Sequence, residues 1–156
     1  MYKLIAITAL SLAAAALASG CGTSDDETAA AAPLTKPEFV RQANEICGKV
    51  GNENEAALAS MQKKASETKL TNEQSRVDFA LKEVVGPAMQ NLAQELETLT
   101  PPAKDQQQVD QMVQRLDNGG KTLAKEGFAG MSDAKFSEFQ REATAYGLEG
   151  CVGLIY

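Results

Sequence analysis

Three cysteines, Cys21, Cys47 and Cys151, offer the most distinctive chemistry in this sequence. A thiol can pair with another thiol, bind a metal ion, attack an electrophile or carry a lipid. An exported protein normally pairs its cysteines, so an odd number leaves one to be explained. The C-x-x-C spacing of a redox pair is absent from the sequence. A structural zinc ion would also need more ligands than two cysteines without histidine easily supply.

Other motifs for catalysis are missing from the sequence. There is no histidine, which removes the commonest general base and the commonest metal ligand. No nucleophile elbow, phosphate-binding glycine loop, H-E-x-x-H or EF-hand loop is present. Glu95 and Glu97, two positions apart, do not share a helix face, although the fold could still assemble a carboxylate pair for hydrolysis. We predict that the protein is not an enzyme and has no catalytic site, metal site or cofactor.

The composition limits the classes of partner. The chain has 156 residues, and its 21 acidic residues outnumber 15 basic ones, for a formal net charge of -6. A surface of this sign argues against nucleic acid and against binding an anionic membrane through the protein's own side chains. The hydrophobic fraction of 44% is sufficient for one domain with a real core.

Residues 1–20, MYKLIAITALSLAAAALASG, have the pattern of an export signal. A lysine near the start is followed by an apolar, alanine-rich run and a small-residue end. The alternative is a transmembrane anchor, but the run from Ile5 to Ala18 is shorter than the roughly 20 residues that a spanning helix needs. We therefore predict a cleaved signal peptide.

The residues around Cys21 resemble the lipobox of bacterial lipoproteins, in which small residues precede an invariant cysteine. Ser19 and Gly20 fit that pattern, whereas Ala18 stands where leucine is usual. The resemblance implies that Cys21 is the first mature residue and that its sulfur carries a diacylglycerol. Two or more acyl chains anchor stably, at about 0.8 kcal/mol per buried methylene. We thus expect an extracytoplasmic protein whose partner is the outer face of the cell membrane, reached through the lipid on Cys21.

Residues 21–34 contain Gly, Ser, Thr, acidic residues, an alanine run and Pro33, with no hydrophobic periodicity. Such a segment cannot bury enough apolar surface to offset its ordering entropy, so we predict a flexible tether. From residue 35 to 156 the apolar residues recur at helical spacing, which indicates a helical domain.

Four helices are expected in that domain. The first begins after Thr35 and runs to about residue 64, bent or broken near Gly51; the second begins at a capping box formed by Thr71 and Gln74. Pro87 predicts a kink in the second helix. The run Asn118-Gly119-Gly120 is expected to weaken or end the third helix. Gly147 is expected to be the glycine C-cap of the fourth. Their apolar stripes comprise Phe39, Ala43, Ile46, Cys47 and Val50, then Val77, Leu81, Val84, Ala88, Leu92, Leu96 and Leu99, then Val109, Met112, Val113 and Leu116, and finally Phe136, Phe139, Ala143 and Tyr146.

No segment alternates like a strand, so the predicted fold is all-α: an antiparallel four-helix bundle with a kinked second helix, preceded by the tether. The first and last helices of such a bundle are neighbours, so Cys47 and Cys151 could form a disulfide bond. The alternative is two separate buried thiols. In the chain-entropy model a closed loop of about 100 residues contributes at most about 4.7 kcal/mol.

A second resemblance covers about residues 35–153. The sequence is similar there to small secreted helical proteins and lipoproteins common in actinobacteria. The residues that carry the resemblance are Phe39 and Ile46-Cys47 in a first helix, the Leu-Thr-Pro-Pro junction at residues 99–102, and Ala145-Tyr146-Gly147-Leu148 ahead of Cys151. This resemblance supports the disulfide and the location, and it transfers no active site.

We therefore expect a non-catalytic binding or interaction module of the cell envelope, with an envelope protein or a small ligand as partner. The expected contact surface is the middle of the second helix, at Val85, Pro87 and Met89. The alternatives are a structural or stress-related envelope protein without a specific ligand, or a carboxylate-dependent hydrolase. The aromatic residues of the first and last helices could line a ligand cleft or belong to the core.

Overall fold

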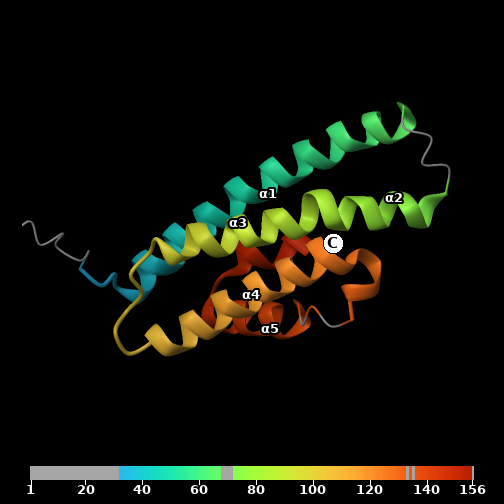
Figure 1. Cartoon of the computed structure of the whole chain (residues 1–156). Coiled ribbons are helices and arrows are strands. Elements are labelled where there is room, and N and C mark those ends of the chain that lie inside the picture. The colour runs from blue at the N-terminus through green and yellow to red at the C-terminus, as the bar shows by residue number, and fades with distance from the viewer. Residues whose placement is uncertain (1–31, 68–71, 133, 135, 156) are drawn as a thin grey trace, which may run out of the picture. The chain divides into compact units, whose positions relative to one another are not determined.

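The computed structural model describes residues 32–67, 72–132, 134 and 136–155, and within these residues all regular secondary structure is helical, with no strand (Figure 1). The predicted all-α class is therefore confirmed. The predicted signal peptide, Cys21 and the predicted tether up to residue 31 lie outside the described residues. Leu34, the last residue of the predicted tether, packs against the core and donates its N–H to the carbonyl of Thr100 at 2.9 Å.

Helix α1, Lys36–Glu67, begins where the sequence predicts and continues without a break. The Glu38 carboxylate accepts hydrogen bonds from the backbone N–H and the hydroxyl of Thr35, at 3.0 and 2.5 Å. The predicted interruption near Gly51 is absent from this helix. A single glycine costs a helix only about 1 kcal/mol, and the alanine- and glutamate-rich residues that follow Gly51 are good helix formers.

The second helical segment has three parts: α2, Glu73–Ala80; a π-helical turn η1, Leu81–Val85; and α3, Gly86–Glu97. Its N-cap is Asn72, whose side-chain oxygen accepts from the Ser75 N–H at 2.6 Å, while the predicted capping residue Thr71 lies outside the described residues. The π turn ends just before Pro87, with the Gly86 N–H bonded to the Leu81 carbonyl. A proline has no N–H to donate, and a π turn is one way to accommodate this inside a helix.

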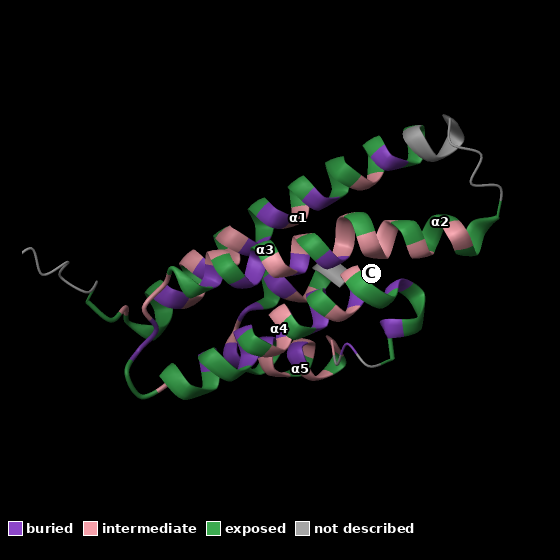
Figure 2. Ribbon diagram, in the orientation of Figure 1, coloured by how far each residue is buried: buried purple, intermediate pink, exposed green. Residues whose placement is uncertain are grey.

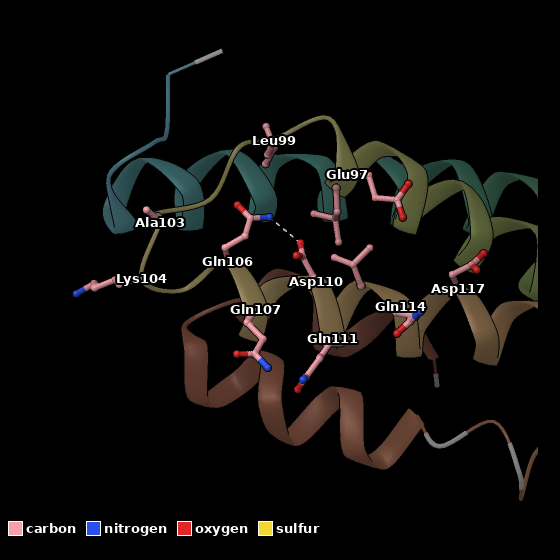
Figure 3. Close-up of a pocket in the computed structure, with 12 residues that line it drawn as sticks. Glu97, Leu99, Ala103, Lys104, Gln106, Gln107, Asp110, Gln111, Gln114 and Asp117 are labelled. Atoms are coloured by element: carbon pink, nitrogen blue, oxygen red, sulfur yellow. Dashed lines mark hydrogen bonds between the residues drawn. The ribbon is translucent and has the colours of Figure 1, made fainter. Parts of the chain in front are cut away.

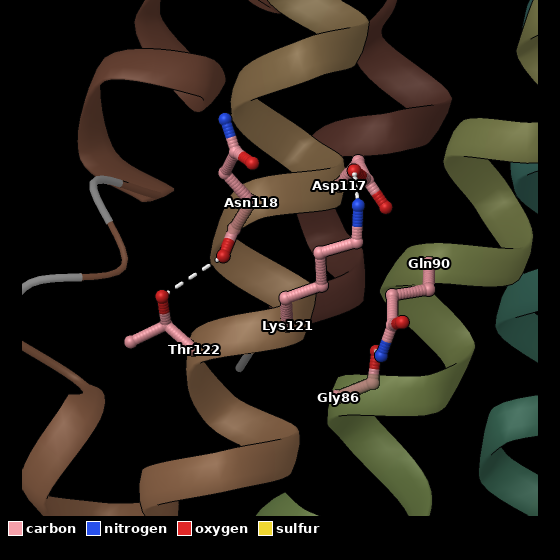
Figure 4. A network of polar contacts seen from close by, with 6 residues as sticks. All are labelled: Gly86, Gln90, Asp117, Asn118, Lys121 and Thr122. Carbon is pink, nitrogen blue, oxygen red and sulfur yellow. Dashed lines mark hydrogen bonds and ion pairs between the residues drawn. The ribbon is translucent and has the colours of Figure 1, made fainter.

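Helix α4, Gln106–Glu126, runs through Gly119 and Gly120. The helix therefore does not end at these glycines, which was one of the two outcomes predicted for them, and both are buried where α4 packs against α3 and α5. A Cβ atom on Gly120 would lie 2.9 Å from the Gly86 carbonyl oxygen, and one on Gly86 would lie 2.5 Å from the Ala124 nitrogen. Figure 4 shows Gly86 on α3 beside α4. The glycines allow two helix backbones to approach closely.

The chain then passes through a short 3-10 turn, η2 (Gly127–Gly130), to α5 (Phe136–Tyr146) and a final 3-10 segment, η3 (Glu149–Ile155). The predicted C-cap of the last helix is confirmed. Gly147 has φ of 102°, and the Leu148 N–H bonds to the Ala143 carbonyl at 2.8 Å. This left-handed position favours glycine and turns the chain back toward α1.

The buried faces of α1, α3, α4 and α5 contribute to one core, whereas α2 has no buried residue (Figure 2). Phe39 of α1 packs edge-to-face on Tyr146 of α5, with ring centroids 5.9 Å apart. Phe39, Phe139 and Tyr146 are all buried among core residues, which assigns them to the core instead of a ligand cleft. The other members of this core are Ala43, Cys47, Val50, Met89, Leu92, Ala93, Leu96, Val109, Met112, Val113, Leu116, Ala143, Leu148 and Cys151.

Cys47 and Cys151 form a disulfide bond, as predicted, with their Cα atoms 4.9 Å apart. The bond joins the middle of α1 to η3, and both cysteines are fully buried. A crosslink between residues separated by 104 positions restricts the unfolded chain strongly, so it stabilises the folded domain.

Candidate binding site

A cleft with a volume of about 280 Å³ lies between α1 and the η1–α3 junction, next to Pro87. The wall on the second helical segment is made by Val84, Pro87, Ala88 and Asn91, together with Glu83. The first four of these residues recur at spacings of three and four, which places them on one helix face. The wall is therefore mostly apolar, with Glu83 and Asn91 as its polar groups.

Helix α1 supplies the opposite wall through Val50, Glu53, Asn54 and Ala57. These positions are also three or four apart, so they continue the face that carries Cys47 into the core. Val50 is buried, whereas Glu53 and Ala57 are exposed at the rim. The cleft thus begins where the hydrophobic core ends.

Asn54 is the unusual residue of this cleft. It is only 8% exposed, and its side-chain oxygen is buried without a hydrogen-bond partner among the described residues. A buried polar atom without a partner costs about 1–3 kcal/mol, and such atoms are rare in folded proteins. Asn54 therefore needs an explanation that packing does not supply.

A second hollow of about 460 Å³, with mostly apolar walls, lies further along α1. Leu58 and Met61 of α1 face Val77 and Ala80 of α2 across it, and Gln62, Glu73 and Arg76 complete its lining. Val77 is 38% exposed, which is high for a residue in an apolar stripe. Apolar side chains thus extend from the Pro87 cleft along the space between α1 and α2.

The structure separates the three residues predicted as a contact surface. Pro87 is exposed and lines the cleft, and Val85 is half-buried against the core. Met89 is 0% exposed and belongs to the core, so its inclusion in an exposed surface was wrong. Helix geometry gives the reason, because residues 87 and 89 are two apart and point to different faces.

Asn54, Glu53 and Glu83 were not predicted as site residues. A signal for Asn54 exists in the sequence, since it falls at the spacing of Cys47, Val50 and Met61 and is a polar residue in an apolar stripe. For the two glutamates no such signal is available, because exposed glutamates are common on helices. Their grouping depends on how α1 packs against the second helical segment.

Lys49, the lysine next to the cleft residues on α1, forms its ion pair with a residue outside the cleft. The Lys49 ammonium forms an ion pair with Glu95 at 3.1 Å. The hydrogen bond to Glu95, the charge of Glu95 and the charge of Glu53 together raise the pKa of Lys49. Glu83 forms no ion pair with any residue that the structure describes. Glu83 consequently brings to the rim of the cleft a negative charge that no ion pair among the described residues neutralises, whereas the charge of Glu53 also acts on Lys49.

A larger groove of about 810 Å³ lies between the end of α3 and the first half of α4 (Figure 3). Its lining is mainly polar, with exposed glutamine and acidic side chains, and Gln106 donates to the Asp110 carboxylate at 2.7 Å. These groups are open to solvent, so water satisfies them. The groove is less suited to a ligand than the Pro87 cleft, since ligand sites are mostly apolar with a few placed polar groups.

Two exposed aromatic side chains mark a fourth hollow, of about 540 Å³, between α2 and η2. Phe79 and Phe128 are 40% and 51% exposed. The Asp78 carboxylate accepts from the Phe128 N–H at 3.0 Å and pairs with Lys82 at 2.9 Å. The bonds from Lys82 and Phe128 lower the pKa of Asp78, so its carboxylate stays charged and holds the η2 turn against α2.

No group of three or more His, Cys, Asp or Glu suited to a metal ion occurs among residues 32–67, 72–132, 134 and 136–155. None of the helices in that part of the chain is long and apolar enough to cross a membrane. Comparisons of the chain with family models, with curated proteins and with solved structures find no match. Its function must therefore be inferred from its own residues.

Proposed function

We propose that this chain is a lipoprotein anchored to the outer face of the cell membrane, with a non-catalytic binding module as its helical domain. The observation that supports this most is the Cys47–Cys151 disulfide. Two of three cysteines are consumed by it, so Cys21, which follows the lipobox-like residues, is the one left for lipid. Disulfides persist in oxidising compartments, which fits an exported protein.

The proposed architecture suits that role. We interpret the helices as an antiparallel four-helix bundle in which α2, η1 and α3 act as one second helix, bent at Pro87. A tether over residues 21–34 would hold this bundle near the membrane. Tethering raises the effective concentration of a binding module for partners at the same surface.

Binding is a better supported role than catalysis. The sequence has no histidine, and the proposal uses all three thiols for lipid or disulfide. A hydrolase would then need a buried carboxylate or lysine with a strongly shifted pKa next to its substrate. The cleft at Pro87 instead combines apolar walls with a few polar groups, which is the pattern of a ligand site. The second candidate, a structural envelope protein without a ligand, has no such feature in its favour.

The anchor can be tested by labelling cells with a radioactive fatty acid. The wild-type protein should take up the label and partition into detergent, and Cys21→Ser should remain unprocessed or unlabelled. Cys151→Ala, which leaves Cys21 intact, is the control and should still be labelled. An unlabelled wild-type protein would refute the lipid anchor.

The binding role can be tested at two adjacent alanines of α1. Ala57 lines the cleft and Ala56 does not, although both are exposed. A photo-crosslinking amino acid at position 57 should capture an envelope component in cells, whereas the same group at position 56 should not. Equal capture at the two positions, or none at either, would count against a binding surface in this cleft.

A further inference from the structure

We infer that the Pro87 cleft binds an alkylammonium group, through the unpartnered carbonyl oxygen of Asn54 and the carboxylates of Glu53 and Glu83. This inference rests on the proposed binding role and names the chemistry of the ligand. A primary ammonium carries three hydrogen-bond donors and no acceptor. It is therefore the complement of the Asn54 oxygen and of the two carboxylates, which are acceptors.

The first argument is the state of Asn54. Asn54 lines the cleft, and its side-chain oxygen is buried and accepts no hydrogen bond from a described residue. A buried acceptor without a hydrogen bond destabilises the free protein, and a hydrogen bond donated by a ligand would remove that destabilisation. The gain on binding is larger than at an exposed amide, where water already supplies the bond.

The second argument is the charge of the lining. Glu53 and Glu83 bring negative charge to it, and the lining contains no lysine or arginine. Lys49, the neighbouring cation on α1, is held by Glu95 at 3.1 Å. Pro87 has no backbone N–H, so it offers no donor to an anion. The electrostatics of the cleft thus favour a cation over an anion or a neutral acceptor.

The third argument is the shape and polarity of the remaining walls. Val50, Ala57, Val84, Pro87 and Ala88 give the cleft apolar sides in a volume of about 280 Å³. An ammonium group alone would leave these sides unfilled, whereas a short alkyl chain would bury them. The ligand class is accordingly a primary ammonium on an alkyl stem. Its source would be either a lysine side chain of a partner protein or a free alkylamine.

The inference can be tested by NMR titration of the full, isotope-labelled chain in non-ionic detergent micelles. The probe n-butylammonium should shift the amide signals of residues 50–57 and 83–91 in a saturable way. Butyrate and 1-butanol, which have similar stems with an anionic or neutral head, should not saturate the same signals. Saturation by 1-butanol at the same concentration, or no shift with the ammonium, would overturn the inference.

A second arm distinguishes the two sources of the ammonium. Nα-acetyl-lysine N-methylamide presents the group as a peptide would. Tighter binding of this compound than of n-butylammonium would assign the cleft to a lysine side chain, and the reverse order would assign it to a free amine. Either result supports the ammonium site, and failure of both compounds to bind overturns it.

Substitutions in the cleft distinguish an effect on ammonium binding from an effect on the stability of the fold. Asn54→Leu keeps a similar shape and removes the unpartnered oxygen, so it should raise the thermal midpoint and weaken ammonium binding by about tenfold or more. Glu83→Gln should weaken binding roughly threefold, and added salt should reduce that difference. Glu55→Gln, the same change at an exposed α1 position outside the cleft, is the control and should leave binding unchanged.

A lower thermal midpoint for Asn54→Leu with unchanged ammonium affinity would show that Asn54 is structural, and would overturn the inference. The experiments also distinguish a failure of the ammonium site from a failure of the proposed binding function. If ammonium compounds fail to bind while position 57 still gives crosslinks in cells, only the ammonium site is wrong. If both fail, the proposed binding function is wrong as well.

Discussion

The side chain of Asn44 accepts a hydrogen bond from the Gly150 N–H, with a distance of 2.9 Å from oxygen to nitrogen. The amide nitrogen of the same side chain donates to the Gly147 carbonyl oxygen at 3.1 Å. One residue of α1 thereby bonds to both ends of the turn that leads from α5 into η3. Asn44 lies one helical turn from Cys47. The C-terminal segment is therefore held against α1 by the Asn44 hydrogen bonds and by the adjacent disulfide bond.

Asn44→Ala is expected to destabilise the domain by about 1–3 kcal/mol, because two hydrogen bonds are lost and the turn is released. Urea unfolding at neutral pH measures the change. Asn52→Ala, an exposed asparagine on the same helix, is the control and should change the free energy of unfolding by less than about 0.5 kcal/mol. Equal effects at the two positions would show that the Asn44 contacts contribute nothing specific.

Cys151→Ala is expected to cost about 2–5 kcal/mol of unfolding free energy, the usual range for a native disulfide in a small secreted domain. Reductant should lower the urea midpoint of the wild-type protein and leave that of Cys151→Ala unchanged. Mass spectrometry of a non-reduced digest should recover the peptides of Cys47 and Cys151 linked. Alkylation of both thiols in freshly isolated wild-type protein would contradict the pairing.

The predictions that held rest on periodicity and local capping. Cys47 lies on the apolar stripe of α1 and Gly147 precedes a hydrophobic residue, so both the disulfide and the final C-cap could be predicted from the sequence. The α-helical class follows from the same spacing. The spacing and capping signals are local, since each depends on residues within a few positions along the chain. The pairing of Cys47 with Cys151, 104 positions apart, also needed the expectation that the first and last helices are neighbours.

The predictions that failed concern residues whose role depends on a distant partner. The run Asn118-Gly119-Gly120 was expected to weaken or end a helix, because glycine is a poor helix former, yet α4 continues through Gly120. In the structure it lies against the Gly86 carbonyl, 34 positions away, where any side chain would collide. Of the candidate contact surface, only Pro87 lines the cleft, because the opposite wall, including Asn54, comes from another helix. Sequence spacing places a residue on a face, but it does not show what that face meets.

Gly86→Ala and Gly48→Ala are expected to change stability in opposite directions. The new methyl group at position 86 would meet the Ala124 backbone at 2.5 Å, so α3 and α4 must separate, at a cost of about 1–3 kcal/mol. At position 48 no atom lies within 4 Å, so alanine should add about 0.5–1 kcal/mol through its better helix propensity. Chemical denaturation of both variants measures the difference, and stabilisation by Gly86→Ala would contradict the close helix contact.

Tyr146 is expected to make the domain sensitive to alkaline pH. Burial and the hydrogen bond from its hydroxyl to the Asp105 carboxylate, at 3.0 Å, raise the pKa of Tyr146 above its usual value near 10. In the unfolded chain this phenol ionises near pH 10, while in the folded protein it keeps its proton. The stability that it contributes is therefore fully present below pH 10 and is lost as pH rises above that value.

The comparison of wild type with Tyr146→Phe isolates this effect from the lysines, which titrate in the same range. At pH 7 the variant should be less stable by about 0.5–1.5 kcal/mol, because the bond to Asp105 is lost. Between pH 9 and 11 the wild-type protein should lose more stability than the variant, so the two urea midpoints should converge. Phenolate absorbance near 295 nm should also show one tyrosine of the folded wild-type protein resisting ionisation until unfolding. Parallel decline of both midpoints with pH would show that Tyr146 titrates alike in the folded and unfolded chains, and would refute the prediction.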